Sequence, residues 1–286
     1  MSEPVRRLPP WLKRRLGAGP DFEKTAAALS DLGLETICVH ANCPNRGQCW
    51  QRGTATVLIL GGVCTRNCRF CSVAHGRPEP PDPDEPRRVG ELARRMDLRY
   101  LVITSVDRDD LPDGGAGHFR DVVQHCRNML PALQFELLVP DFRDCQDKAL
   151  EILGAARPFV FGHNVETVPA LYGRARPGGD YARSLRLLEK AKDLWPETQT
   201  KSALMLGLGE TDEQVMEVLH DLRAVGCDRV AIGQYLRPSK ASLPVEAYIA
   251  PEQFDAWAAR ARALGFTWVM SSPFTRSSYH AEEKQA

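Results

Sequence analysis

From residue 56 onward, short apolar runs rich in β-branched residues alternate with segments of helical period. This alternation predicts repeated βα units around a parallel sheet. Successive strand ends lie about 25–45 residues apart, which leaves room in each interval for a helix and its return loops. The sequence predicts six strands, and a seventh apolar run, 267–270, follows a last helix. The six strands are 56–60, 100–104, 134–139, 159–163, 201–206 and 229–234.

The helix expected after the fifth strand shows how clear the local signals are. Thr211 and Gln214 form a capping-box pair, and Gly226 supplies the stop after an apolar face at helical spacing. The intervals fit a full or partial (β/α) barrel and also an open doubly wound sheet, and periodicity does not separate the two. In both arrangements functional groups collect at the carboxyl ends of the strands.

Composition limits the function classes. A chain of 286 residues with 43% hydrophobic content can bury one large core, so we expect one principal domain. Basic and acidic residues number 37 each, which gives no broad positive field for nucleic acid. No run approaches the roughly 18 apolar residues of a membrane span. We therefore expect neither nucleic acid nor a membrane as a partner.

The cellular compartment is predicted from the N-terminus and the cysteines. The early basic residues are not followed by an apolar signal-peptide core; they are Arg6, Arg7, Lys13, Arg14 and Arg15. Nine cysteines without a secretion signal indicate metal or redox chemistry in a reducing compartment. We expect a cytoplasmic protein.

Three cysteines follow the first predicted strand directly, as Cys64-x3-Cys68-x2-Cys71, here called the strand-end cysteine group. Structural zinc takes four ligands and a disulfide takes two, so three thiolates leave one coordination place open. This number suits a cubane iron–sulfur cluster in which one iron has no protein ligand. A zinc site completed by a distant residue such as His75 is the alternative.

With Phe70 before the third cysteine, this loop resembles that of the radical S-adenosylmethionine superfamily. The resemblance implies an α/β fold with a partial (β/α)6 barrel of the TIM type. It also implies that the amino and carboxylate groups of S-adenosylmethionine chelate the open iron of a 4Fe-4S cluster. Breaking an unactivated C–H bond needs a primary carbon radical, and a strongly reducing cluster supplies the electron that generates one.

A second set of three lies upstream, as Cys38-x4-Cys43-x5-Cys49, here called the N-terminal cysteine group. A second cluster is the economical interpretation. Zinc with His40 as the fourth ligand stays open, although His40 lies very close to Cys38 in sequence.

Both cysteine groups, together with Arg276-Ser277-Ser278-Tyr279 near the C-terminus, resemble the lipoyl synthase family, and the resemblance extends from Pro10-Trp11-Leu12 over nearly the whole chain. It implies that Ser278 is the fourth ligand of an auxiliary 4Fe-4S cluster. Without this resemblance, a serine near the C-terminus would ordinarily be interpreted as a solvated hydroxyl or a local cap. An oxygen ligand is harder than a thiolate and holds a thiophilic cluster less well, which suits a sulfur donor.

The same resemblance implies a reaction and partners. Two S-adenosylmethionine molecules serve the insertion of sulfur at C6 and C8 of an octanoyl chain that is amide-linked to a lysine of a lipoyl carrier protein. Sulfide of the auxiliary cluster is consumed, so both sites must face one cavity. The implied carriers are the glycine cleavage H protein or the 2-oxoacid dehydrogenase E2 lipoyl domains. The implied helpers are an electron donor such as flavodoxin or ferredoxin and an iron–sulfur cluster carrier.

Polar residues at other strand ends are candidates for cofactor contacts. Thr104, Ser105 and Asp107 follow the second strand, and we expect them at the methionyl amino group or the ribose of S-adenosylmethionine. The alternative is a polar surface loop without a binding role. Asn164 and Glu166 follow the fourth strand, where family members contact the cofactor. Candidates for the cofactor carboxylate or for carrier docking, by strand-end position and charge, are Arg176, Lys201 and Arg237.

These motifs divide the chain into three segments. We expect an N-terminal extension with the auxiliary cysteines at 1–54, the barrel at 55–250, and a C-terminal helix and tail at 251–286. The proline-rich run 77–86 is expected to cross the surface in an extended form. A biotin synthase-like enzyme, or a zinc-stabilised binding module, remains the alternative to a lipoyl synthase.

Overall fold

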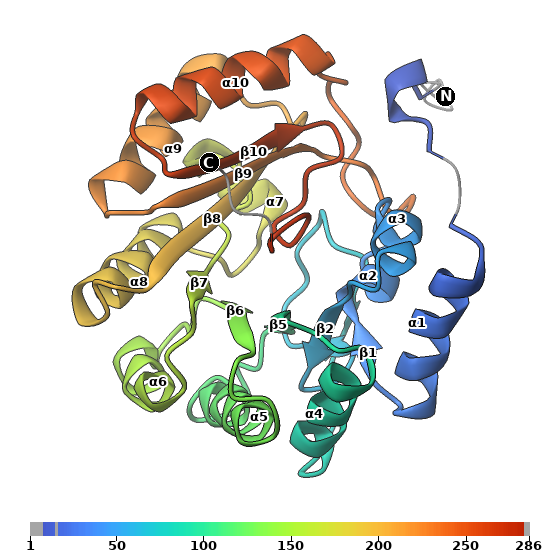
Figure 1. The fold of residues 1–286 in the computed structure, drawn as a ribbon. Coiled ribbons are helices and arrows are strands. Elements are labelled where there is room, and N and C mark those ends of the chain that lie inside the picture. The colour runs from blue at the N-terminus through green and yellow to red at the C-terminus, as the bar shows by residue number, and fades with distance from the viewer. Residues whose placement is uncertain (1–7, 15–16, 283–286) are drawn as a thin grey trace.

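The centre of the molecule is a curved sheet in which seven parallel strands follow one another in sequence order (Figure 1). The computed structural model describes residues 8–14 and 17–282, so Arg6, Arg7, Arg15 and the last four residues lie outside the described part. The parallel strands are β2 (Thr56–Ile59), β5 (Tyr100–Ser105), β6 (Gln134–Leu138), β7 (Val160–Gly162), β8 (Gln199–Leu206), β9 (Arg229–Gln234) and β10 (Trp268–Ser272). All six predicted strands, and the seventh run, are confirmed.

The strand order decides between the two predicted arrangements. A doubly wound sheet reverses its order at a switch point, whereas here each parallel strand pairs with the next along the chain. The two-residue strand β1 (Glu35–Thr36) adds to β2 in antiparallel orientation and was not predicted. Since β1 and β10 form the two edges, the sheet is a partial barrel, as expected.

Six helices follow the strands and form the outer layer (Figure 1). They are α4 (Glu85–Arg95), α5 (Ala116–Met129), α6 (Gln146–Leu153), α8 (Tyr181–Leu194), α9 (Asp212–Ala224) and α10 (Pro251–Ala263). The capping box of α9 is confirmed, because the Gln214 amide N–H donates to Thr211 Oγ1 and the Thr211 amide N–H donates to Gln214 Oε1. Gly226 follows with φ at 73°. The structure also contains the single-turn helix α7 (Tyr172–Ala175) and the short strand pair β3 (Val63–Cys64) and β4 (Ala74–His75).

The proline-rich run is helical at its end, contrary to the prediction. Glu85 and Pro86 form the start of α4, because proline is tolerated in a first helical turn, where its missing N–H has no partner to lose. The buried Glu85 carboxylate accepts the Leu60 amide N–H at 2.9 Å and lies 2.6 Å from His118 Nε2. The start of α4 thereby fixes the end of β2, where the loop of the strand-end cysteine group begins.

The N-terminal segment and the tail after β10 meet at the open side of the barrel. The N-terminal segment forms α1 (Pro20–Asp31), α2 (Ile37–His40) and α3 (Arg46–Gln51). The tail after β10 returns to it: Asn45 Nδ2 donates to the Phe274 carbonyl oxygen at 2.7 Å, and the Tyr279 hydroxyl donates to Gln48 Oε1 at 2.9 Å. Figure 1 shows this red tail beside α2 and α3. In the described part of the chain, no helix has the length and apolarity of a membrane span.

Candidate active site

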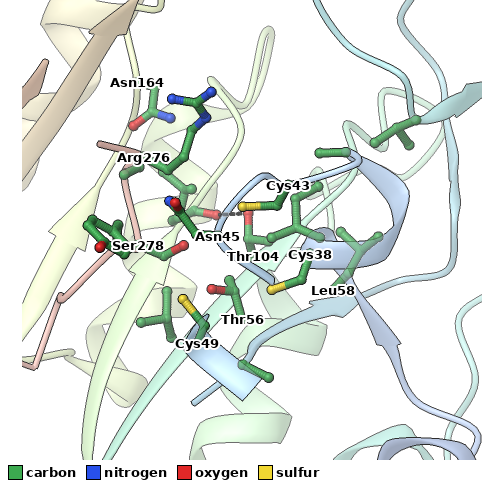
Figure 2. A pocket seen from close by; sticks show the side chains of 18 of the residues that line it. Cys38, Cys43, Asn45, Cys49, Thr56, Leu58, Thr104, Asn164, Arg276 and Ser278 are labelled. Atoms are coloured by element: carbon green, nitrogen blue, oxygen red, sulfur yellow. Dashed lines mark hydrogen bonds between the residues drawn. The ribbon is translucent and has the colours of Figure 1, made fainter. Parts of the chain in front are cut away.

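One cavity of about 760 Å³ occupies the carboxyl ends of the strands and the open side of the barrel. Its wall contains every predicted cluster ligand, namely Cys38, Cys43, Cys49, Cys64, Cys68, Cys71 and Ser278. Figure 2 shows Cys38 and Cys43 on one side, Ser278 and Asn164 on the other, and Cys49 below and between them. The fold therefore brings together residues up to 240 positions apart, counted from Cys38 to Ser278.

The strand-end cysteine group lies on a loop fixed by backbone contacts. The chain leaves β2 through Leu60 and Gly61, both at positive φ (68° and 85°), and this turns the loop across the barrel mouth. Thr65 anchors it to the next strand end, because its amide and its hydroxyl both donate to the Asp107 carbonyl oxygen, at 3.0 and 2.9 Å. The amide N–H of Arg66 donates to Cys64 Sγ, and that of Val73 to Cys71 Sγ, each at 3.4 Å. Such N–H donors favour thiolate ligands.

Arg66, inside the strand-end cysteine group, clamps the loop to two further strand ends. Its guanidinium binds Asp109 through two bonds of 2.7 and 2.6 Å and lies 2.7 Å from Asp141. It also lies 3.2 Å from Asp107. Although desolvation opposes charge, these carboxylates raise the pKa of Arg66. We did not predict this role of Arg66 from the sequence. The signal that could have indicated it is a basic residue between two cysteines, together with aspartates at the ends of two later strands.

The N-terminal cysteine group lies on two short helices and on the loop between them, which carries Cys43. Cys38 is in α2, which Thr36 caps by accepting the Val39 amide N–H, and Cys49 is in α3. The Ser72 hydroxyl donates to the His40 carbonyl oxygen at 2.6 Å and joins the two cysteine loops. His40 Nε2 lies 2.5 Å from Glu35 Oε2, and His75 is exposed outside the cavity wall. Neither histidine that was considered for zinc is therefore placed toward the thiols.

Burial controls the protonation of the thiols. Desolvation raises the pKa of Cys64 to about 11 and of Cys49 and Cys68 to about 12, and it also raises the pKa of Cys38 and Cys71. As thiolates, the cysteines of each group repel one another. Cys38 and Cys43 therefore add to the rise in the pKa of Cys49, and Cys71 and Cys64 add to the rise in the pKa of Cys68. These raised pKa values favour the protonated thiols, so iron displaces protons when it binds the cysteines.

The residues fit iron–sulfur ligation, because each cysteine group offers three thiols on the wall of the cavity. Among residues 8–14 and 17–282, no three His, Cys, Asp or Glu side chains are arranged to hold one metal ion. A four-iron cluster takes one thiolate per iron, so its ligands need only surround a shared volume, and each cysteine group borders such a volume in the cavity.

The polar candidates after β5 and β7 also line the cavity. Asn164 Nδ2 donates to Glu166 Oε1 at 3.0 Å, while Asn164 Oδ1 is buried and has no hydrogen-bond partner among the described residues. Arg176 Nη1 donates to the Asn164 carbonyl oxygen at 3.0 Å. Desolvation raises the pKa of Glu166, and Arg176 opposes this rise. An unpartnered buried acceptor beside a carboxylate fits the amino group of a ligand.

The remaining candidates donate hydrogen bonds to backbone carbonyl oxygens. Thr104 Oγ1 donates to the Leu138 carbonyl oxygen, and Ser105 Oγ donates to that of Val106, each at 2.9 Å. Arg237 directs its guanidinium to carbonyl oxygens of its own loop, including Ser242 at 2.9 Å. All three line the cavity, as Asp107 does.

Lys201 is the one predicted site residue that the structure does not bring to the cavity. Its fully buried ammonium pairs with Glu136 at 2.8 Å and lies 4.6 Å from the Trp268 ring centroid. Desolvation lowers its pKa, and Glu136 opposes this effect. Lys201 is near the amino end of β8, whereas the site is at the carboxyl ends, so a role in cofactor or carrier binding is not supported.

The comparisons with known proteins first define a class. The model of the Radical SAM superfamily matches residues 58–222. Methylornithine synthase has the same fold, with a TM-score of 0.55 at 13% identity over 92% of this chain and 83% of that one. Streptococcus suis SuiB bound to S-adenosylmethionine also matches, with a TM-score of 0.55 at 12% identity over 72% of this chain and 45% of that one. The fold and the strand-end cysteines thus define a radical S-adenosylmethionine protein, which carries a 4Fe-4S cluster and S-adenosylmethionine.

The curated relatives then define the family. Lipoyl synthase from Methylococcus capsulatus is 52% identical over 280 residues, which cover 98% of this chain and 87% of that protein. Lipoyl synthase from Syntrophotalea carbinolica is 51% identical over 274 residues, which cover 96% of this chain and 89% of that protein. The chain belongs to the lipoyl synthase family, as the sequence motifs indicated.

Proposed function

We propose that this chain converts a protein-bound octanoyl group into a lipoyl group by inserting sulfur at C6 and C8. The observation that carries the proposal is that both cysteine groups and Ser278 line one cavity. A radical formed at one cluster and a sulfur atom held in another must reach the same carbon chain, so the two sites need a common space. Family membership supports the same reaction.

In this proposal the strand-end cysteine group holds the cluster that activates the cofactor. Cys64, Cys68 and Cys71 supply three ligands and leave one iron open. When bound, this cluster supplies the electron that cleaves S-adenosylmethionine to methionine and a 5′-deoxyadenosyl radical. The protein's part is to orient the cofactor and to exclude water. We assign the amino group to Asn164 and Glu166, and assign Thr104, Ser105, Asp107, Arg176 and Arg237 to the surrounding wall.

The N-terminal cysteine group and Ser278 hold the second 4Fe-4S cluster, which serves as the sulfur substrate. Support comes from the tail, because the Asn45 bond to the Phe274 carbonyl fixes the chain four residues before Ser278. An oxygen ligand is a poorer match for a thiophilic cluster than a thiolate. The Ser278 side is therefore where this cluster opens to release sulfur.

Partners and segments follow from the same proposal. The substrate is a lipoyl carrier protein, and the glycine cleavage H protein and 2-oxoacid dehydrogenase E2 lipoyl domains are the proposed carriers. A flavodoxin or ferredoxin supplies electrons, and an iron–sulfur cluster carrier rebuilds the second cluster. None of the nine cysteines forms a disulfide, and we place the protein in the reducing cytoplasm. The proposed segments 1–54, 55–250 and 251–286 carry the N-terminal cysteine group, the strand-end cysteine group and Ser278, in that order. The last segment also belongs to the sheet, because its strand β10 pairs with β9 of the barrel.

Mass spectrometry of an octanoylated carrier tests the proposed reaction. With anaerobically reconstituted protein, a strong reductant and S-adenosylmethionine, we expect a carrier that has gained two sulfur atoms. The control omits the reductant and should leave the octanoyl group unchanged. Cleavage of S-adenosylmethionine without any gain of sulfur would contradict the assigned reaction but leave the radical chemistry intact.

A further inference from the structure

Leu60 has a backbone conformation that leucine rarely adopts. It follows β2 directly, its φ is 68°, and its side chain is buried against the start of α5, where a Cβ at Gly115 would lie 2.4 Å from Leu60 Cδ1. In this left-handed region the Cβ atom of an L-residue crowds the following carbonyl oxygen, so the conformation persists only where the surrounding structure holds it. Cys64 lies four residues further on. The direction in which the chain leaves Leu60 therefore sets where the strand-end cysteine group begins.

Two buried charged side chains hold the backbone of Leu60, one on each side of its peptide groups. The Glu85 carboxylate, from the start of α4, accepts the Leu60 amide N–H at 2.9 Å. The Arg108 guanidinium, from the loop after β5, donates to the Leu60 carbonyl oxygen at 3.2 Å. Hydrogen bonds with one ionised partner are stronger than those between neutral groups. We call these three residues the Leu60 clamp.

Each charged member of the Leu60 clamp is itself fixed by a further side chain. His118 Nε2 of α5 lies 2.6 Å from Glu85 Oε2. The Asp110 carboxylate accepts two bonds from Arg108, at 2.9 and 2.8 Å. The helices α4 and α5 lie side by side outside the sheet (Figure 1). Two outer helices and the loop after β5 therefore converge on the one residue at which the chain leaves β2.

The Leu60 clamp lies outside the cavity. Among the described residues that form the cavity wall, Leu60, Glu85 and Arg108 are not included. The later part of the loop is held separately, because Thr65 donates twice to the Asp107 carbonyl oxygen. The clamp therefore acts on the site through the position of the chain between Leu60 and Thr65.

We propose that Glu85 and Arg108 are positioning residues for the strand-end cysteine group, an inference that rests on the proposed role of this group in cofactor activation. By holding Leu60 at positive φ, they direct the loop so that Cys64 and the other two cysteines of the group surround one volume. Without these bonds Leu60 relaxes toward the negative φ that leucine prefers, and Cys64 moves relative to its two partners. A displacement of about 1 Å that arises far from the chemistry can cost roughly 100-fold in rate.

Reconstituted variants of Glu85 test the proposal. Glu85→Gln keeps an acceptor oxygen for the Leu60 amide, whereas Glu85→Leu removes it with little change in size. We expect kcat for 5′-deoxyadenosine formation to fall about tenfold or more in Glu85→Leu and to stay within about threefold in Glu85→Gln, as for loss or retention of the hydrogen bond. The matched control is Glu91→Leu, the same change on the same helix, which breaks the bonds to Arg94 and Arg95 and should leave kcat unchanged.

A spectroscopic readout accompanies the rates. Only a cluster with an open iron binds the cofactor, so the change that S-adenosylmethionine makes in the EPR spectrum of the reduced protein reports on the strand-end cluster. This change should be altered in Glu85→Leu and preserved in Glu85→Gln and Glu91→Leu. An unaltered spectrum and rate in Glu85→Leu would overturn the proposal, and so would an equal loss in Glu85→Gln.

Glycine at position 60 separates positioning from general stabilisation of the barrel. Glycine adopts positive φ without a steric cost, so a loop that starts at glycine depends less on the clamp. The loss of kcat caused by Glu85→Leu should be at least about threefold smaller in a Leu60→Gly background than in the unchanged protein. Arg108→Met, compared in the same two backgrounds, repeats the test from the carbonyl side of Leu60 and serves if Glu85→Leu does not fold. Equal losses in both backgrounds would contradict a positioning role.

Failure of this inference is distinguishable from failure of the proposed function. Formation of 5′-deoxyadenosine is measured without a carrier protein, whereas the proposed function is measured by sulfur gain on the octanoylated carrier. The expected pattern of rates without any sulfur gain contradicts only the function. Sulfur gain in the unchanged protein without that pattern contradicts only the role of the Leu60 clamp.

Discussion

Replacement of Cys68 by alanine is expected to abolish both cleavage of S-adenosylmethionine and formation of the lipoyl group. Cys68 is half-buried and close enough to Cys64 and Cys71 for their charges to raise its pKa. A cluster with two remaining thiolates has too few protein ligands to stay bound at a reducing potential. Iron should fall from about eight to about four per chain, since two four-iron clusters are expected in the unchanged protein. Iron analysis and the yield of 5′-deoxyadenosine measure the two effects.

The matched control for this variant is Cys145→Ser. Cys145 caps the start of α6 and lies outside both cysteine groups and outside the cavity wall. The Cys145→Ser variant should keep about eight irons per chain and full cleavage of S-adenosylmethionine. Retention of cofactor cleavage in Cys68→Ala would remove the strand-end group from its assigned role.

Replacement of Ser278 by alanine is expected to separate the two halves of the reaction. The strand-end cluster should assemble and cleave S-adenosylmethionine, because its three cysteines are unaffected. Lipoyl formation should fall by roughly tenfold or more, since even loss of an outer partner of a metal ligand costs about 10–100-fold. The ratio of lipoyl group formed to 5′-deoxyadenosine released measures this separation.

Ser277→Ala is the comparison that tests which serine acts. Both serines line the cavity, and Ser277 Oγ is buried without a hydrogen-bond partner in the described part of the chain. The family pattern assigns the second serine, so Ser277→Ala should keep lipoyl formation near that of the unchanged protein. Loss in Ser277→Ala with normal activity in Ser278→Ala would transfer the ligand role to Ser277.

The barrel could be predicted because its signals are local. Each parallel strand is a short apolar run, and the pair Thr211 and Gln214 sets the start of α9 within four residues. The strand β1 was missed because Glu35 and Thr36 form only a two-residue pair with β2. A pairing of that length leaves no periodic pattern in the sequence.

The site could be predicted where spacing carries the chemistry, as in the two cysteine groups. Where the partner is distant in sequence, local patterns do not indicate the contact, and only the family resemblance linked Ser278 to the N-terminal cysteine group. Asn45 and Phe274 are 229 residues apart, and no local pattern indicates that the tail closes the barrel. Lys201 was predicted from strand-end position and charge, but it lies near the amino end of β8, where its ammonium pairs with Glu136.

The most direct test of the account is to trace the inserted sulfur. The clusters are reconstituted with sulfide carrying the heavy isotope of sulfur, free sulfide is removed, and one turnover is run on an octanoylated carrier with unlabelled S-adenosylmethionine. The account predicts that both sulfur atoms of the lipoyl group carry the label, because the auxiliary cluster beside Cys38, Cys43 and Cys49 supplies them. A lipoyl group with unlabelled sulfur would contradict it.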